Sequence, residues 1–142
     1  MKTWILLLAL SFPIFAQAKA AEKTIFVCAF DNGKSVRVTE RGDVYRYQYG
    51  KANQPELVFE NNRAEAIKRS PRWQGIGRNL WINLTLKNGQ YQYSLGWSMD
   101  RLTDEHEESY FLTVERNEQF VTQQTCRAKP KPIFNPPEEL QL

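Results

Sequence analysis

The 142-residue sequence has one histidine and two cysteines, and these low counts narrow the chemistry that the chain can perform. Because His106 is the only imidazole, a mechanism that needs two histidines is excluded. The cysteines form no Cys-x-x-Cys pair, so a dithiol redox centre and a cysteine zinc site lose their usual basis. We therefore expect neither a metal ion nor another cofactor.

An excess of charge of one sign is also missing. The sequence has 19 basic and 16 acidic residues, for a formal net charge of +3. Nucleic-acid binding usually depends on clustered lysine and arginine that displace counterions from the phosphate backbone. A balance this even does not indicate such a surface, so we expect no nucleic-acid partner.

Long apolar runs are absent after the N-terminal segment. This segment begins with Met1-Lys2, continues as a largely apolar stretch from Trp4 to Phe15 and ends in Ala16-Gln17-Ala18. Such an order is typical of a secretory signal peptide, and about twelve apolar residues are too few to cross a hydrocarbon core of ~30 Å. The sequence predicts a signal peptide over residues 1–18, no membrane anchor after processing, and a periplasmic or secreted mature chain.

The two cysteines are Cys28 and Cys126, near the two ends of the expected ordered region. An oxidising compartment favours a disulfide between them. Closing so long a loop removes denatured-chain entropy equivalent to about 4 to 5 kcal/mol. Two free buried thiols, or a reactive pair, are the alternative interpretations.

Short segments in which residues of two kinds alternate, as the two faces of a strand require, recur along residues 24–126. Turn residues separate these segments. In residues 44–49 every second position is tyrosine, and in residues 80–97 two alternating segments flank Asn88-Gly89. Further strands are expected at residues 24–30, 35–40, 56–60, 110–115 and 119–126. Seven or eight strands predict an all-β fold, a small antiparallel meander barrel or sandwich closed by one disulfide.

The expected organisation is a single β domain over residues 19–126. Within it, residues 61–70 fit either a helical turn or an irregular strand, which Pro71 would end. Residues 127–142 carry four prolines and are expected to form a flexible, extended tail. The tyrosines of residues 44–49 and 90–97 are expected to face the core. The alternative is an exposed stacking surface for sugar rings or for a protein partner.

Two segments have the character of contact surfaces. Residues 71–79 combine turn chemistry with an aromatic residue flanked by arginines, and such residue types concentrate binding energy at interfaces. Residues 100–108 form an acidic stretch, and its part from Asp104 to Glu108 is a second surface able to meet a basic enzyme. The candidate contact residues are Arg72, Trp73, Arg78, Asp104, Glu105 and His106. The alternatives are that Trp73 closes one end of a barrel and that the acidic segment is a solvated connection.

Catalytic patterns are weak in this sequence. None of the serines available to His106 lies in a Gly-x-Ser-x-Gly elbow, and nothing singles out a pair of carboxylates for glycoside hydrolysis. A histidine among carboxylates could bind a cation or act as a general base, but neither zinc spacing nor a calcium loop is present. We therefore expect a protein that is not an enzyme.

The layout of the sequence resembles the small periplasmic inhibitors of c-type lysozyme. The resemblance covers most of residues 24–126: Phe26-Val27-Cys28 in the first strand, the Asn32-Gly33 turn, a meander, and a last strand ending at Cys126. It implies a β fold and a lysozyme as partner. The inhibitory loop of that family is rich in serine and glycine and ends in a basic residue and tyrosine. Its nearest counterpart, Ser70-Pro71-Arg72-Trp73, lacks the Ser-Gly step, so no family residue is assigned.

These observations predict a non-enzymatic protein-binding module of the periplasm, either an inhibitor of lysozyme or an immunity protein against an envelope-targeting toxin. Residues 47–51 and 54–57 also resemble secreted bacterial proteins of unassigned role. A carbohydrate or envelope-polymer binder that uses exposed tyrosines is the second hypothesis. An enzyme that depends on His106 is the third, and the oligomeric state is left open.

Overall fold

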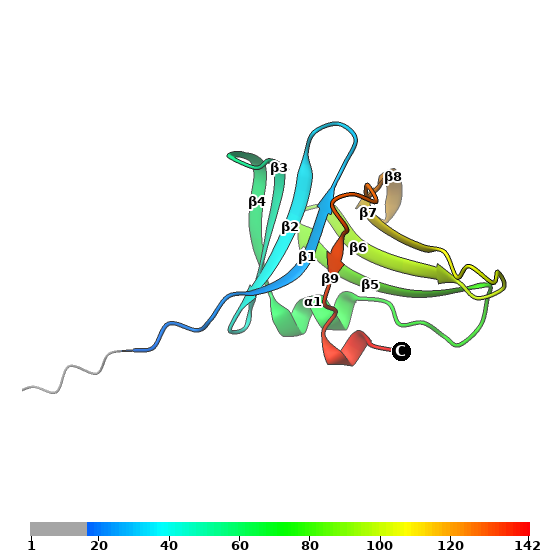
Figure 1. Ribbon diagram of the computed structural model, residues 1–142. Helices are drawn as coiled ribbons and strands as arrows, with labels where there is room; N and C mark the ends of the chain where they lie inside the picture. The colour runs from blue at the N-terminus through cyan, green and yellow to red at the C-terminus, as the bar shows by residue number, and fades with distance from the viewer. Residues whose placement is uncertain (1–16) are drawn as a thin grey trace, which may run out of the picture.

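The computed structural model describes residues 17–142, in which nine strands, one α-helix and one short 3-10 helix follow one another (Figure 1). The expected signal peptide spans residues 1–18, and its first 16 residues lie outside the described part. The elements are β1 (Lys23–Ala29), β2 (Ser35–Arg41), β3 (Val44–Lys51), β4 (Gln54–Asn62), α1 (Arg63–Arg69), β5 (Asn79–Asn88), β6 (Tyr91–Asp100), β7 (Glu108–Arg116), β8 (Gln119–Thr125), β9 (Ile133–Phe134) and η1 (Glu138–Leu140).

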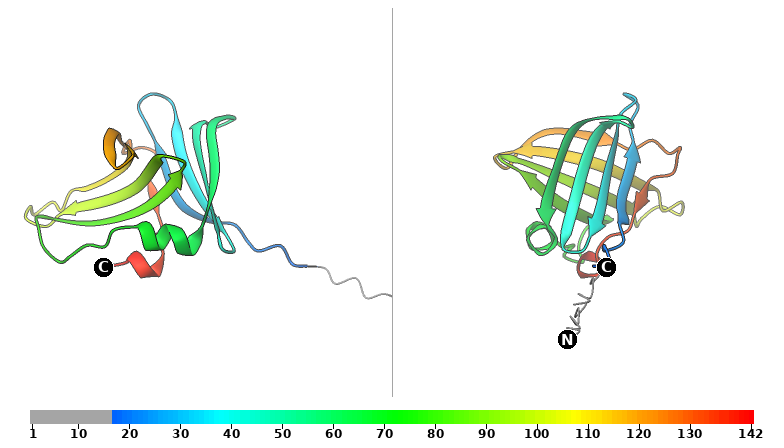
Figure 2. Two further views of the ribbon diagram at one scale, coloured as in Figure 1. Left: turned by 180° about the vertical axis from the view of Figure 1, so that it is seen from behind. Right: turned by 90° about the vertical axis from the view of Figure 1, so that its left-hand side faces the viewer.

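The strands form two antiparallel sheets, ordered β4-β3-β2-β1-β9 and β5-β6-β7-β8. The right-hand view of Figure 2 shows the strands of the first sheet crossing in front of those of the second at a large angle. The helix α1 connects β4 of one sheet to β5 of the other. The predicted all-β fold with one disulfide is confirmed, and the ninth strand is the two-residue β9.

The core lies between the two sheets and is rich in tyrosine. Tyr45 and Tyr47 from β3 and Tyr93 from β6 are buried, as the alternating pattern predicted. Tyr47 stacks on Phe59 with 4.6 Å between ring centroids and contacts Tyr93 at 5.1 Å. At the margin of this cluster, Tyr91 remains 37% exposed.

The predicted disulfide joins Cys28 in β1 to Cys126 immediately after β8, with 5.3 Å between the Cα atoms. It links the two sheets where Arg127 N donates a hydrogen bond to Ala29 O at 2.8 Å. A disulfide indicates a non-reducing compartment. Within residues 17–142, no helix has the length and apolar character needed to cross a membrane.

Residues 61–70, for which a helix and a strand were both open, contain the end of β4 and then α1. The side chain of Asn62 accepts a hydrogen bond from Glu65 N at 3.2 Å and so caps the helix. Ala66 and Ile67 are buried. Tertiary burial and the cap therefore decide a segment whose local pattern is too short to distinguish the two structures.

Residues 127–142 differ from the flexible tail that their prolines suggested, because they pack against the domain. Phe134 in β9 pairs with Phe26 in β1, and the two rings meet edge to face at 5.3 Å. Leu140 is buried in the core, and Glu139 receives two hydrogen bonds from the Arg63 guanidinium at 2.9 and 3.0 Å. The β domain therefore extends past Cys126, because apolar residues between the prolines have core sites to fill.

Gly50 lies at the register shift between β3 and β4, where the backbone of β4 is close. Its φ is 138°, and a Cβ added there would lie 2.7 Å from Glu56 N and 2.9 Å from Gln54 O. We expect Gly50→Ala to lower the free energy of unfolding by more than about 1 kcal/mol in urea denaturation, because backbone atoms cannot move aside. Gly33→Ala is the control, since its φ is 78° but no atom lies within 4 Å of the new Cβ. Equal losses for the two variants would contradict a role for the close approach.

Candidate functional site

Two connections meet at the end of the second sheet that points away from the first (Figure 1). We call them the paired loops: residues 70–78, between α1 and β5, and residues 101–107, between β6 and β7. Arg101 N donates to Arg78 O at 3.0 Å, and the Arg101 guanidinium donates to Gly77 O at 3.1 Å. The pairing of β5 with β6 thus brings together two segments that the sequence presented as separate surfaces.

An ion pair ties the paired loops at their base. Arg78 Nε lies 2.8 Å from Asp100 Oδ2, and a terminal guanidinium nitrogen lies 2.6 Å from the same oxygen. The other carboxylate oxygen accepts a hydrogen bond from Leu102 N at 2.9 Å. These hydrogen bonds, with that from Arg78 first, lower the pKa of Asp100. Because the arginine is exposed to solvent, the pair adds little to the free energy of unfolding. Its position at the base of both loops favours one arrangement of them.

Trp73 supports the paired loops from within. The residue is half-buried, and its indole Nε1 is buried without a hydrogen-bond partner among the described residues. The Arg101 guanidinium lies over the ring, 5.4 Å from its centroid. Trp73 therefore packs against Arg101 of the other loop and offers only part of its surface to a partner.

The remaining candidate residues are exposed. His106 has a φ of 46°, and its Nδ1 lies 3.1 Å from Asp100 O. Asp104 and Glu105 precede it on the surface of the second loop. Arg72 lies toward η1, where it makes a minor contribution to the lowered pKa of Glu139, which the hydrogen bond from Arg63 chiefly causes. The structure thus places four of the candidates at the far end of the second sheet, namely Arg78, Asp104, Glu105 and His106. Arg72 lies nearer η1.

The most exposed apolar side chains of the paired loops are not among the residues that the sequence singled out. Ile76 is 82% exposed and Leu102 is 73% exposed. Ile76 stands between Gly75 and Gly77, whose φ values are 79° and 112°. Gly75 and Gly77 mark a turn, and turns lie mostly on the surface. An apolar residue between two turn glycines is the signal in the sequence that could have pointed to Ile76.

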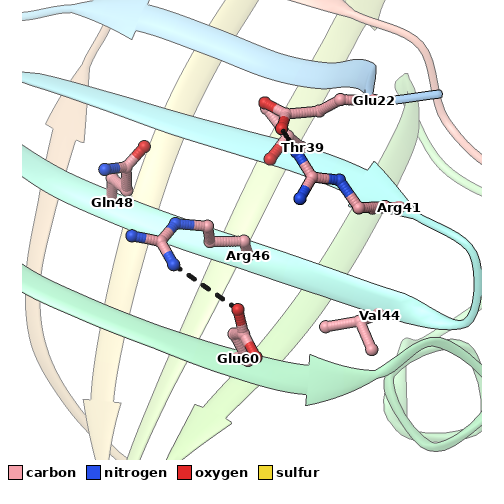
Figure 3. Close-up of a pocket in the computed structure, with 7 residues that line it drawn as sticks. All are labelled: Glu22, Thr39, Arg41, Val44, Arg46, Gln48 and Glu60. Atoms are coloured by element: carbon pink, nitrogen blue, oxygen red, sulfur yellow. Dashed lines mark hydrogen bonds and ion pairs between the residues drawn. The ribbon is translucent and has the colours of Figure 1, made fainter. Parts of the chain in front are cut away.

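A hollow lies on the outer face of the first sheet (Figure 3). This depression has a volume of about 500 Å³ and crosses β2, β3 and β4. It is lined by Glu22, Thr39, Arg41, Val44, Arg46, Gln48 and Glu60. Each arginine already has a carboxylate partner, at 2.6 Å for Arg41–Glu22 and 3.5 Å for Arg46–Glu60. An acidic ligand would have to displace these partners, so the depression is a weaker candidate than the paired loops.

Over residues 17–142, the structure has no group of three or more histidine, cysteine, aspartate or glutamate side chains arranged to hold a metal ion. No family model, curated protein or solved structure matches the chain.

Proposed function

We propose that the chain is a non-enzymatic binding module of the periplasm whose paired loops contact a protein partner. The observation that carries the proposal is the position of Ile76 and Leu102. They are the two most exposed large apolar side chains in the described part of the chain, and they lie on the two loops that are tied together. Apolar side chains held out in solvent and rimmed by charge have the make-up of a protein interface.

The way in which the loops are held favours tight binding. The Arg78–Asp100 ion pair and the hydrogen bonds from Arg101 fix the loops before a partner arrives. Preorganised loops lose less conformational entropy on binding than mobile ones. The exposed carboxylates of Asp104 and Glu105 would steer a basic partner toward this end of the sheet.

A lysozyme or an envelope-targeting toxin is the partner class that we put first, because of the layout of the sequence and the non-reducing compartment that the disulfide indicates. Carbohydrate binding ranks second. That hypothesis depended on exposed tyrosines, and Tyr45, Tyr47 and Tyr93 are buried.

The paired loops can be tested with purified c-type lysozyme and the oxidised mature chain. We expect the double variant Ile76→Ser/Leu102→Ser to weaken binding at least about tenfold in calorimetric titrations and to relieve inhibition in a cell-lysis assay. Both side chains are exposed, so thermal stability should be unchanged. Asp104→Asn/Glu105→Gln should slow association and reduce its dependence on salt.

Leu142→Ser is the matched control, because this side chain is 58% exposed but lies outside the paired loops. Equal weakening by the control and the loop variant would reject the paired loops as the contact. Absence of binding to every lysozyme tried would reject lysozyme as the partner and direct the same variants to envelope-targeting toxins.

A further inference from the structure

The two sheets have four edges, formed by β4, β9, β5 and β8. An edge strand with free backbone N–H and C=O groups can pair with a strand from another chain. Proteins avoid such pairing by placing proline or charge on the edge, by shortening it or by covering it. The four edges of this protein differ in how far they are protected.

Three edges are protected, each in a different way. The β4 edge carries Pro55 and the exposed charges of Glu56 and Glu60. The β9 edge is only two residues long and is followed by Pro136. Proline and charge disfavour an incoming strand at the β4 edge, and the β9 edge offers little backbone to pair with.

The β5 edge is covered by side chains from the segment that precedes it. Ser70 Oγ accepts a hydrogen bond from Thr85 N at 2.8 Å. The Asn61 side chain accepts from Lys87 N at 2.7 Å and donates to Lys87 O at 2.8 Å. The outer backbone groups of β5 are thus already partly satisfied within the chain.

The β8 edge has none of these protections. Its seven residues, Gln-Phe-Val-Thr-Gln-Gln-Thr, include no charge and no proline, and all except Gln124 are exposed. Phe120 is 66% exposed and Val121 is 51% exposed. Within residues 17–142, the only strand that pairs with β8 is β7.

We propose that β8 pairs antiparallel with β8 of a second copy of this chain, so that the two four-stranded sheets become one continuous sheet. A strand without charge meets its own copy without electrostatic repulsion. Pairing about a twofold axis is closed, so it ends at a dimer. Because the other three edges are protected, β8 is the edge through which two copies can join their sheets. The contact would cover the apolar side chains of Phe120 and Val121.

Such a dimer would leave the paired loops free. The register places Gln119 of β8 beside Arg116, the last residue of β7. The paired loops lie at the other end of β7, next to Glu108. Two copies joined at β8 would therefore present two sets of paired loops. Because the paired strands are antiparallel, the two sets would lie at opposite ends of the joined sheet, where each could hold a partner of its own.

Sedimentation of the oxidised mature chain over a range of concentrations tests the pairing. We expect a reversible dimer in the wild type. Val121→Lys and Val121→Glu should each raise the dimer dissociation constant by at least about tenfold, because each variant places like charges on both strands close to the twofold axis. A mixture of the two variants should restore association, because opposite charges then meet.

Val58→Lys is the control, because Val58 is an exposed valine on the β4 edge strand. It should leave the dimer unchanged. A wild type that stays monomeric at every concentration would overturn the proposal, as would a mixture of the charged variants that stays monomeric. Lysozyme binding by a monomeric chain would separate this outcome from the fate of the proposed function.

Discussion

Replacement of both cysteines, Cys28→Ala/Cys126→Ala, is expected to lower the free energy of unfolding by about 4 to 5 kcal/mol. The two residues are 98 positions apart, so the bridge removes much of the conformational freedom of the denatured chain. Small domains have total stabilities of about 5 to 15 kcal/mol, so the variant would lose a large share of its stability. Urea denaturation followed by tryptophan fluorescence measures the difference.

The structure indicates why the bridge should matter this much. Within the described residues, β8 and β1 share no backbone ladder, although each lies in a sheet that contributes to the core. Near the bridge, the contacts between the sheets include Arg127 N to Ala29 O and the weak hydrogen bonds of Gln124 with the Tyr49 hydroxyl. Wild type under reducing conditions is the control. A loss below about 1 kcal/mol would mean that the noncovalent contacts alone hold the sheets together.

The alternation of residues predicted the strands because half-buried strands need an apolar residue at every second position. Tyr45, Tyr47 and Tyr93 follow this rule and are buried. The C-terminal strand β9 could not be recognised in the same way. Its two residues are too few for a period, and the partner of Phe134 is Phe26, more than a hundred positions earlier.

The candidate contact residues could be recognised by type, but their arrangement could not. Whether Arg78 and Asp100 meet depends on the register of β5 with β6, which pairs Asn79 with Asp100. Exposure is likewise a property of the folded chain. Leu102 looks like any other leucine in the sequence, and only the fold leaves it in solvent.

The largest effect of a single substitution is expected at the centre of the aromatic core. Tyr47→Ala should lower the free energy of unfolding by about 3 to 5 kcal/mol, because a ring that is 1% exposed and packs on Phe59 and Tyr93 would leave a cavity. Chemical denaturation measures the loss. Tyr91→Ala is the matched control, since this ring is 37% exposed and its removal should cost much less.

The pH dependence of stability provides a second measurement on the same side chain. Burial raises the pKa of the Tyr47 hydroxyl in the folded chain, so its contribution to stability is fully present below the pKa of an ordinary tyrosine, about 10. Above that pH the unfolded chain ionises first, and stability falls as the pH rises. Tyr47→Phe retains most of the ring packing and removes the ionisable group. It should therefore lose less stability at neutral pH than Tyr47→Ala and show a shallower alkaline decline than wild type. An unchanged alkaline decline in Tyr47→Phe would assign that decline to other groups.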